Sequence, residues 1–377
     1  MNERMYVDFH VLQIVPPSCI NRDDTGSPKT AIYGGTMRAR VSSQAWKRAM
    51  RLMFRDLFGT DQLGYRTRNT VTLVAEQVLA LDPGMDAEKA EKLSAEILEL
   101  TGVKSEKGKD VLFFISSKQI VKLARLALEY GNVADKEKKN AKSEKKNAKS
   151  ETVKKIKDSA IKAVSEEPGI DMLLFGRMAA GNPSLNYDAA AQVAHSISTH
   201  TVSNEYDYFT AVDDCGEEDN AGAAHIDTIE YNSSTLYRYA TVNVAELAKN
   251  LNTEELCSTI RGFAEAFILS MPTGRQNSFA NRTVPNLVYV TVRRDQPVNL
   301  VGAFERPVAA GDDGYADRSA RALFGYAGKV YDDFVPGPEK AWVIGGNEDY
   351  SPAEKTNLKG LLAGLDEAVR EYSPKEG

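Results

Sequence analysis

Hydrophobic residues along the chain follow the spacing of β-strands in some segments and of α-helices in others. Residues 6–16 are rich in β-branched and aromatic side chains and end at Pro16-Pro17, so they predict a first strand. Similar patterns predict further strands at residues 38–41, 189–199, 236–244 and 287–292. Apolar residues at helical spacing predict helices from about Gln44, over residues 254–270 and near residues 354–371.

Two insertions interrupt this series of strands and helices. Residues 56–183 are dominated by helical spacing, and helices are predicted at residues 70–80, 86–100, 116–130 and 152–164. In residues 200–228, apolar residues flank an acidic tip that contains glycine, which is the composition of a protruding β-hairpin. Removing both insertions leaves the order strand, helix, strand, strand, helix, strand. This order predicts an α+β fold built on a ferredoxin-like βαββαβ unit, which is also the topology of RNA-recognition modules.

The stretch from Gly34 to Arg55 carries a charge opposite to that of the whole chain. The chain has a formal net charge of -6, whereas this stretch holds only basic and uncharged residues. Its cations are Arg38, Arg40, Lys47, Arg48, Arg51 and Arg55. A purely structural helix face usually mixes both signs, so the stretch predicts a surface that binds a polyanion. A solvated basic helix face is the alternative.

The same stretch predicts a helix with one buried side. Ser42 and Ser43 can cap this helix by accepting hydrogen bonds from its free N–H groups. Apolar residues then recur at the spacing of a stripe that faces the core, with a row of cations beside it. The stripe consists of Trp46, Met50, Met53 and Leu57. Ahead of it, Gly34-Gly35 would let the backbone approach a phosphate closely.

Length and composition indicate a chain with more than one folded part. At 377 residues the chain exceeds the size of about 250–300 residues at which single cores stop growing. No apolar run approaches the roughly 20 residues that span a bilayer, and residues 1–4 lack the hydrophobic region of a signal peptide. We therefore expect a cytoplasmic protein without a membrane partner.

The cysteines and histidines do not form a recognisable metal or disulfide pattern. Cys19, Cys215 and Cys257 are far apart, make no CxxC pair and are odd in number. His195 and His200 would point to opposite faces of an extended segment. We expect no metal and no cofactor, and histidines that are buried or hydrogen-bonded.

A lysine-rich tandem repeat lies within the helical insertion. Residues 138–144 and 145–151 share the sequence Lys-Lys-Asn-Ala-Lys-Ser-Glu. Such a tract is typical of a solvated helix or a flexible surface loop, and contact with nucleic acid is the alternative.

Several short segments, taken in order along the chain, form a recognisable set. They are residues 17–24 (Pro-Ser-Cys-Ile-Asn-Arg-Asp-Asp), 34–44 with Gly-Gly and Arg-Val-Ser-Ser-Gln, 47–51 (Lys-Arg-Ala-Met-Arg), 176–178 (Gly-Arg-Met) and 207–214 (Asp-Tyr-Phe-Thr-Ala-Val-Asp-Asp). Together these segments resemble the CasC-type backbone subunit of the type I-E CRISPR Cascade complex. The lysine repeat has no recognised counterpart in that family.

The resemblance implies a hand-shaped protein within a ribonucleoprotein of antiviral defence. The palm would comprise residues 1–57, 184–199 and 229–377, which include the C-terminal segment; the helical fingers would be residues 58–183, and the thumb hairpin residues 200–228. Family members assemble head-to-tail along a CRISPR RNA, and the thumb of one subunit reaches over the RNA to its neighbour. The implied partners are the CRISPR RNA, target DNA through guide pairing, further copies of the chain and other Cascade subunits.

The resemblance also implies two sets of contact residues. The guide-RNA backbone would be lined by Arg22, Lys29, Ser42, Gln44, Lys47, Arg48 and Arg51. Bases near the kink of the RNA would be contacted by Met178, and displaced nucleotides by the thumb residues Tyr208, Phe209, Val212 and Ile226. We expect such a protein to be a scaffold without catalytic residues.

Two other functions compete with the scaffold. Asp23-Asp24 lies beside cations and would bind Mg²⁺ in a metal-dependent RNA endonuclease, although no His or Lys base accompanies it at a recognisable spacing. Paired aspartates are also common in turns. The second alternative is a generic RNA-binding module with no fixed assembly.

Overall fold

The computed structural model describes residues 4–103, 112–139, 146–179, 182–211, 225–347, 350 and 352–372. The chain divides into two compact units: unit 1 comprises Met1–Met53 and Ala191–Gly377, and unit 2 comprises Phe54–Ala190. Unit 2 is thus one continuous insertion, and it extends beyond the expected fingers region at both ends. None of the described helices has both the length and the hydrophobicity needed to cross a lipid bilayer.

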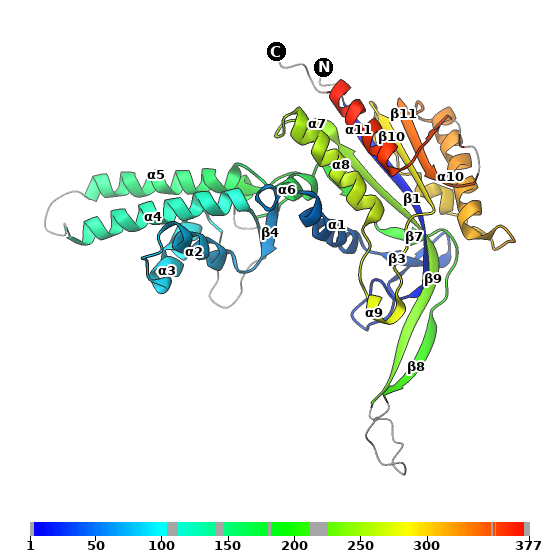
Figure 1. The fold of residues 1–377 in the computed structure, drawn as a ribbon, viewed down its shortest axis with the longest axis horizontal. Helices are drawn as coiled ribbons and strands as arrows, with labels where there is room; N and C mark the ends of the chain where they lie inside the picture. The colour runs from blue at the N-terminus through cyan, green and yellow to red at the C-terminus, as the bar shows by residue number, and fades with distance from the viewer. Residues whose placement is uncertain are drawn as a thin grey trace, which may run out of the picture. The chain divides into compact units, whose positions relative to one another are not determined.

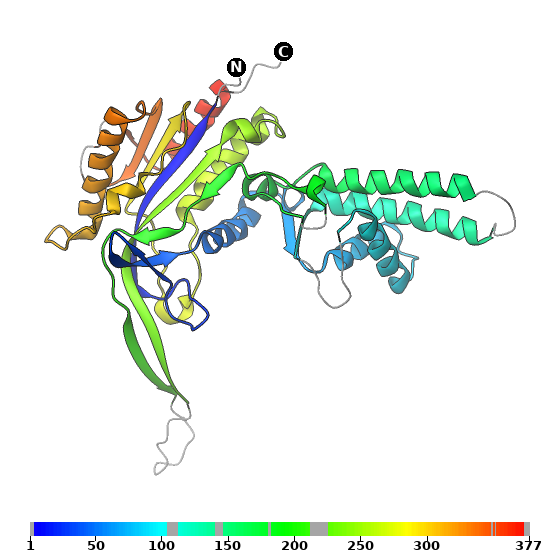
Figure 2. The same cartoon turned by 180° about the vertical axis from the view of Figure 1, so that it is seen from behind.

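Unit 1 is built on one large sheet (Figures 1 and 2). Its described strands are β1 Tyr6–Ser18, β2 Thr30–Tyr33, β3 Thr36–Val41, β6 Ala191–Val193, β7 Ser196–Ser198, β8 Glu205–Ala211, β9 His225–Asn243, β10 Leu287–Arg293, β11 Lys340–Gly345 and β12 Glu354–Lys355. They lie in the order β12-β11-β10-β1-β9-β7-β3-β2, and β6 and β8 also pair with β9. The pairing of β11 with β12 is parallel, whereas β1 is antiparallel to both of its neighbours, β9 and β10.

Helices cover both faces of this sheet. They are α1 Ser43–Leu57, whose last residues belong to unit 2, α7 Val244–Leu247, α8 Thr253–Leu269, α9 Gln276–Phe279, the 3-10 helix η3 Leu300–Phe304, α10 Gly314–Asp333 and α11 Leu358–Tyr372. Figures 1 and 2 show α8 and α11 over one face and α10 over the other. On the first face, the Phe9 ring centroid lies 5.5 Å from that of Phe263. On the second face, Leu12 belongs to one core cluster with Leu323 of α10. Because both faces are covered, residues 7–13 of β1 are buried without a break, although Asp8, His10 and Gln13 among them are polar.

Two of the predicted strands have different bounds in the structure. The strand predicted at residues 189–199 is interrupted at Ala194 and His195, which separate β6 from β7. The strand predicted at residues 236–244 is the final part of β9, which begins at His225 within the hairpin and runs without interruption past residue 228. Residues 230–235 are mostly polar and give no hydrophobic pattern in the sequence, although β9 runs through them and buries Asn232, Ser234 and Thr235.

The layer formed by α10 and the strand β11 was not expected from the sequence. The buried residues of α10 are small or few, namely Ser319, Ala320, Leu323 and Ala327. Glycines at positions 325 and 328 further weaken the helical signal, because glycine disfavours helix interiors. The mixed α+β class itself is confirmed.

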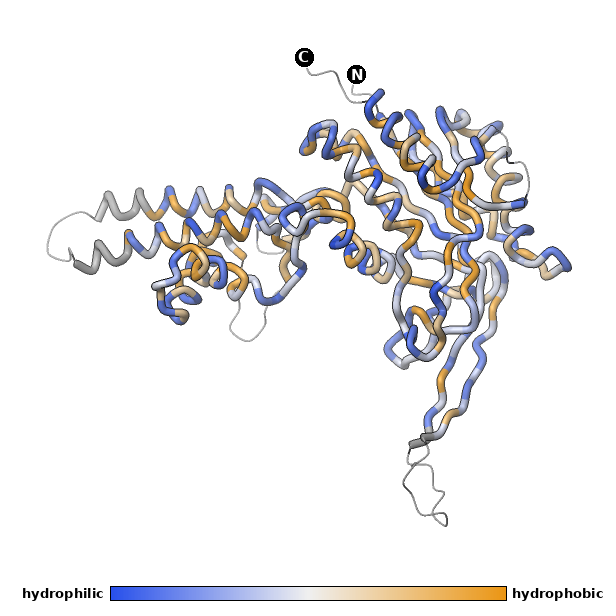
Figure 3. The backbone as a smooth tube through the Cα atoms, in the orientation of Figure 1, coloured by the Kyte–Doolittle hydropathy of each residue, from blue (hydrophilic) through white to orange (hydrophobic). Residues whose placement is uncertain are grey.

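Unit 2 is mainly helical, as predicted. Its described elements are η1 Thr60–Gln62, β4 Gly64–Thr67, α2 Thr70–Leu81, α3 Ala87–Leu100, β5 Phe113–Ser116, α4 Ser117–Lys139, α5 Lys146–Ser165, α6 Ile170–Phe175 and η2 Pro183–Leu185. The four predicted helices correspond to α2, α3, α4 and α5, which share a core that includes Val74, Leu93, Leu123 and Ile156. Hydrophobic and hydrophilic stretches alternate along these helices in Figure 3, as expected for helices with one buried face. The two ends of the lysine repeat fall on α4 and α5, and residues 140–145 lie outside the described part of the chain.

A buried carboxylate lies on the α10 face of the unit 1 sheet. One oxygen of Asp8 accepts a hydrogen bond from the backbone N–H of Val298 at 2.8 Å, and the other accepts one from the Tyr239 hydroxyl at 3.0 Å. Loss of solvation nevertheless raises the pKa of Asp8 to about 6. The folded protein therefore binds this proton more tightly than the unfolded chain does.

This raised pKa predicts a stability that falls as the pH rises. The contribution of Asp8 is complete below its unfolded pKa of 3.8 and is lost as the pH rises through about 6. Between pH 4 and pH 7.5, we expect the free energy of unfolding of wild type to fall by about 2–3 kcal/mol more than that of Asp8→Asn, whose amide does not titrate. Urea unfolding across this pH range measures the effect, with Asp332→Asn at an exposed site as the control. Equal pH dependence in wild type and Asp8→Asn would contradict the assignment.

Candidate nucleic-acid interface

The loop between β1 and β2 is fastened to the start of α1 by Asn21. The Asn21 side-chain oxygen accepts the backbone N–H of Ser42 at 2.9 Å, and its backbone carbonyl accepts the N–H of Lys29 at 2.9 Å. Arg22 forms a backbone bridge with Pro28 across the same loop, and its side chain is exposed. The predicted contact residues Arg22, Lys29 and Ser42 are thereby held on one ordered segment of unit 1.

Helix α1 begins at Ser43, immediately after the predicted cap. The Ser42 hydroxyl accepts the backbone N–H of Ala45 at 3.3 Å, so the predicted capping role is confirmed. Only 7% of Ser42 is exposed, whereas Gln44 in the first turn of the helix is exposed. The Ser42 hydroxyl therefore already caps α1, and a contact with RNA would have to use this same hydroxyl.

The cations of α1 lie beside a buried stripe. Lys47 and Arg51 are partly exposed, and Arg48 is exposed. On the buried side, the Trp46 indole N–H donates to the Ser196 hydroxyl at 2.9 Å, and Met50 is fully buried. The first turn of α1 carries no acidic residue. The predicted arrangement of a packed side and a basic side is confirmed for this helix, while Met53 is only partly buried.

Arg38 and Arg40 differ in their environment although both lie on β3. Arg38 is completely buried: its guanidinium donates to the backbone carbonyls of Ser198 at 2.9 Å and Phe304 at 3.0 Å. The interpretation of Arg38 as part of a polyanion-binding surface is therefore wrong, because no ligand reaches its side chain. Arg40 remains partly exposed. Sequence alone does not separate the two, because residues two apart on a strand point to the same face.

Gly34 and Gly35 form the turn between β2 and β3. Both have positive φ values, of 58° and 75°, as a two-residue type I′ hairpin turn requires. A Cβ atom on Gly34 would also lie 1.7 Å from the carbonyl oxygen of Glu305. The turn and this close contact account for glycine at both positions, so the close approach to a phosphate that the sequence suggested is not needed to explain them.

The Asp23 carboxylate is engaged in the turn that it occupies. One of its oxygens accepts hydrogen bonds from the Thr25 hydroxyl at 2.7 Å and from the backbone N–H groups of Thr25 and Ser27, both at 3.0 Å. The hydrogen bond from the Thr25 side chain is the largest cause of the lowered pKa of Asp23. Among the described residues, no group of three His, Cys, Asp or Glu side chains is placed to hold a metal ion. Asp23 is thus explained as a turn residue.

The described cysteines and two of the histidines are parts of the packed structure. Cys19 and Cys257 are buried, and burial raises the pKa of both thiols. Cys215 lies outside the described residues. The His10 ring is 2.8 Å from the Tyr237 hydroxyl, and the His200 ring accepts the backbone N–H of Thr235 at 3.1 Å. The prediction of buried or hydrogen-bonded histidines is confirmed for these two.

In unit 2, the motif Gly176-Arg177-Met178 presents an exposed methionine next to a buried arginine. Arg177 donates to the backbone carbonyls of Leu185 at 2.8 Å and Val164 at 2.9 Å. Its guanidinium also lies over the rings of Phe113 and Tyr187. Met178 is 86% exposed, which leaves its side chain available for a partner. Gly176 adopts a positive φ of 77° at the end of α6, where a side chain would crowd the Tyr187 carbonyl.

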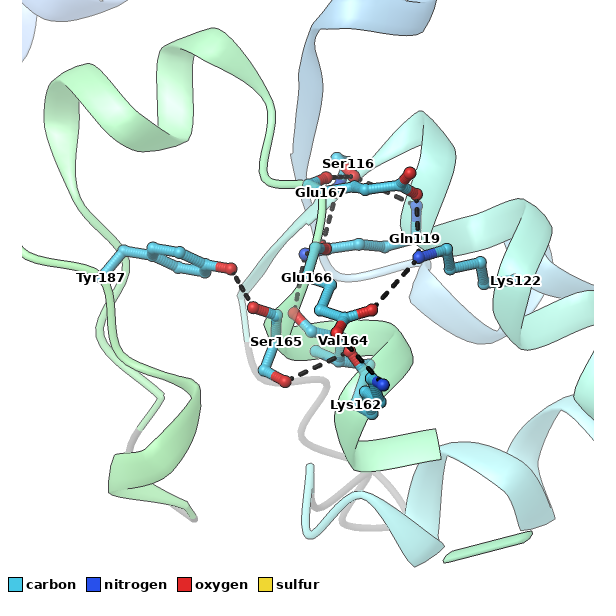
Figure 4. Close-up of polar contacts among 9 residues, drawn as sticks. All are labelled: Ser116, Gln119, Lys122, Lys162, Val164, Ser165, Glu166, Glu167 and Tyr187. Atoms are coloured by element: carbon cyan, nitrogen blue, oxygen red, sulfur yellow. Dashed lines mark hydrogen bonds and ion pairs between the residues drawn. The ribbon is translucent and has the colours of Figure 1, made fainter. Parts of the chain in front are cut away.

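A polar network around the end of α5 supports this motif (Figure 4). The Gln119 amide donates to the carbonyls of Val164 at 2.7 Å and Glu166 at 2.9 Å. Ser116 donates to the Glu167 carbonyl at 2.7 Å, and the Tyr187 hydroxyl donates to that of Ser165. These bonds satisfy carbonyl groups that a helix leaves free at its C-terminus. The helix end, β5 and the segment that carries Met178 are therefore fixed to one another.

The aromatic residues of the predicted thumb lie on the paired strands β8 and β9. Tyr208 is 64% exposed, and Phe209 on the opposite face of β8 is partly buried. Val212 lies outside the described residues, and for Ile226 only the backbone pairing with Thr210 is described. Tyr206 is 67% exposed and shares a face with Tyr208, although the family resemblance does not single it out.

The structure adds residues that sequence reasoning did not list as contacts. Asn21 organises the loop, and Arg40 with His195 lies beside Lys29. Asn21 and Arg40 stand within the motifs that carry the family resemblance, which is the signal that would have found them. His195 has no such signal, because it lies in a break between strands that the pattern of hydrophobic residues does not show.

The fold defined by these units is shared with proteins of CRISPR RNA-guided complexes. A solved structure described as "CRISPR RNA-guided surveillance complex, pre-nicking" contains a chain 33% identical to this one, with a TM-score of 0.81; the match covers 97% of this chain and 100% of that chain. Another, described as "CRISPR RNA-guided surveillance complex", contains a chain 27% identical with a TM-score of 0.59, covering 95% and 99%.

The chain belongs to the CT1975-like protein family, whose model matches residues 7–371. No curated protein matches the chain. The expected relationship to CRISPR surveillance-complex subunits is confirmed at the level of family and fold.

Proposed function

We propose that this protein is a non-catalytic, RNA-binding scaffold of a Cascade surveillance complex in antiviral defence. It polymerises along the CRISPR guide RNA and presents the spacer for pairing with target DNA. The observation that carries this proposal is the match along 97% of the chain, at 33% identity, to a chain of a CRISPR RNA-guided complex. The motifs quoted above favour the CasC-type subunit of the type I-E complex within this class.

The chemistry of the candidate contacts suits a guide of arbitrary sequence. Cations that meet phosphates give affinity without reading bases, and an exposed aromatic or aliphatic side chain can stack on any base. Guide pairing then supplies the specificity, as in another RNA-guided CRISPR effector. Arg22, Lys29, Arg48 and the partly exposed cations of α1 fit the first role, with the exposed Gln44 as a neutral hydrogen-bond donor beside them. Tyr208 and Met178 fit the second role.

We further propose that unit 1 contains a ferredoxin-like palm. In chain order the palm would consist of β1, α1, β7, β9, α8 and β10, and the strands lie side by side as β10-β1-β9-β7, the order of that fold. Support for both helices on one face comes from Arg238, whose guanidinium lies 3.8 Å from the Trp46 ring centroid and 4.8 Å from that of Phe267. Unit 2 would be the fingers, and the β8–β9 hairpin would be the thumb.

The proposed assembly is a head-to-tail array of copies in the cytoplasm, together with other Cascade subunits. A heterologous contact of this kind does not close on itself, so its length requires a ruler or a cap. The guide RNA and the neighbouring subunits would supply both. A ladder of regularly spaced protection along the guide RNA is expected, whereas a single isolated footprint would favour a generic RNA-binding module.

The RNA-backbone role predicts the behaviour of a double variant, Lys47→Ala with Arg51→Ala. Binding to single-stranded RNA should weaken equally for unrelated sequences, and the slope of log K against log salt should fall by about 1.4, because two phosphate contacts are lost. Fluorescence anisotropy over a salt series measures both quantities. The matched control is Lys355→Ala with Lys359→Ala, two exposed lysines near the C-terminus. A loss that depends on sequence, or an unchanged salt slope, would contradict the proposal.

The nuclease alternative receives no support from the geometry, since the Asp23 oxygen is used within its own turn. Incubation of the purified protein with labelled RNA and Mg²⁺ tests it directly. Specific cleavage that disappears in Asp24→Ala would overturn the scaffold as the whole function.

A further inference from the structure

A guanidinium held at two points lies at the junction of β3, β2 and the break between β6 and β7. Arg40 pairs with Ile197 of β7 in the sheet register, and His195 lies in the break. The Arg40 Nη1 atom is 3.1 Å from His195 Nδ1, and Arg40 Nε donates to the Thr30 carbonyl at 3.2 Å. Two contacts on different nitrogens fix the plane of the guanidinium.

The contact with Arg40 defines the protonation of His195. A guanidinium only donates hydrogen bonds, so His195 Nδ1 accepts and its proton lies on Nε2. Burial, followed by the charges of Arg40 and Lys29, lowers the pKa of His195, which keeps the ring neutral at pH 7. His195 is thus a neutral acceptor that positions Arg40 without neutralising its charge.

The positive charge at this junction has no acidic partner in the described part of the chain. The backbone N–H of Arg40 donates to the Lys29 carbonyl at 2.9 Å, which places Lys29, the residue before β2, beside Arg40 on β3. None of the ion pairs formed by the described residues contains Arg40 or Lys29, and both side chains are partly exposed. Arg38, two residues away, uses its donors on carbonyls and is fully buried. Of the two arginines on β3, only Arg40 therefore has guanidinium N–H groups that a ligand can reach.

We propose that Arg40 and Lys29 form a preorganised site for one phosphodiester group of single-stranded RNA, and that His195 is its positioning residue. A fixed, planar guanidinium matches two phosphate oxygens, and the lysine adds a second charge. The inference rests on the proposed RNA-binding function, in which Lys29 is already an expected contact, and adds Arg40 and His195, to which the family resemblance assigns no role. It also explains why an exposed histidine stands where two strands are interrupted.

The test compares Arg40→Ala, His195→Ala and His195→Asn with wild type. Arg40→Ala should weaken RNA binding roughly tenfold, as expected for the loss of one charge-assisted contact, and should lower the salt slope by about 0.7. His195→Ala should weaken binding less and leave the salt slope unchanged, because no charge is lost. Asparagine can place an amide oxygen near the position of Nδ1, so His195→Asn should restore most of the affinity.

A double-mutant cycle separates positioning from direct contact. Adding His195→Ala to Arg40→Ala should cause little further loss, because His195 acts through Arg40. Unfolding in urea should be nearly the same for all variants. Normal RNA binding by Arg40→Ala, or a loss of stability that accounts for its weaker binding, would overturn the proposal and identify a purely structural contact.

Two further measurements show whether the bound phosphate belongs to RNA or DNA, and whether a negative result concerns this site alone or the proposed function. Single-stranded DNA of the same sequence is measured in parallel, and an Arg40 effect on DNA but not on RNA would overturn the assignment to RNA. The Lys47→Ala, Arg51→Ala variant is measured in the same series. If that variant loses RNA binding and Arg40→Ala does not, only this site is wrong; if wild type itself binds no RNA, the proposed function fails.

Discussion

Arg38→Met is expected to lower the free energy of unfolding of unit 1 by about 3–5 kcal/mol, because it leaves buried carbonyl groups without their donor. Arg38 is fully buried and donates to the carbonyls of Ser198, Phe304 and Glu305 and to the Thr36 hydroxyl. Methionine fills a similar length but donates nothing. Tryptophan fluorescence during urea unfolding is a suitable probe, since Trp46 and Trp342 both lie in unit 1.

Arg40→Ala provides the matched control for Arg38→Met. It removes the same side-chain type from the same face of the same strand, yet Arg40 is partly exposed, so its unfolding should change by less than about 1 kcal/mol. The effects on RNA binding should be reversed, with the loss in Arg40→Ala. Similar stability changes in the two variants would show that burial does not distinguish these arginines.

Buried arginines explain why the count of positive residues in the sequence overstates the binding surface. Arg38, Arg177 and Arg238 are all buried and bond to backbone carbonyls. Burial lowers the pKa of Arg177 to about 10 and that of Arg238 to about 9, so both stay charged at neutral pH. Each replaces the water around its guanidinium with carbonyls and aromatic rings. Composition assigns these residues to the surface, and only the three-dimensional packing reveals their positions.

The helices of unit 2 were predictable because each buries one face and exposes the other. The predicted ranges 70–80 and 86–100 differ by only a residue or so from α2, Thr70–Leu81, and α3, Ala87–Leu100. The sheet of unit 1 was less predictable, because its central strands are covered on both faces and give no alternation. Polar residues such as Asp8 and Arg238 then stand inside the core, where a sequence pattern expects apolar ones.

In the candidate site too, features set by neighbouring residues were predictable, and contacts between residues far apart in the sequence were not. The Ser42 cap and the Trp46 stripe follow from neighbouring residues, and both were predicted. The contact between Arg40 and His195 joins residues 155 positions apart, so no local pattern indicates it. Tyr206 was missed for another reason: the resemblance assigns only Tyr208, although residues two apart on a strand share a face and both tyrosines are exposed on β8.

Arg177→Met is expected to lower the free energy of unfolding of unit 2 by about 3–5 kcal/mol. The substitution leaves the carbonyls of Leu185 and Phe114 without this donor and removes the cation stacked on Phe113 and Tyr187. Amide hydrogen exchange read on peptides of α4 and α5 measures the change within unit 2 alone. Arg177→Lys should recover only part of the stability, because a lysine cannot donate in the several directions of the guanidinium.

Met178→Ala is the matched control at the next position of the motif. Met178 is 86% exposed, so its loss should change hydrogen exchange in unit 2 very little while weakening RNA binding if it contacts bases. Arg177→Met should weaken RNA binding as well, but only together with faster exchange around Met178, because it acts through the segment that it anchors. Unchanged exchange in Arg177→Met would contradict the anchoring role. Faster exchange in Met178→Ala equal to that of Arg177→Met would show that the exposed methionine is itself part of the packing.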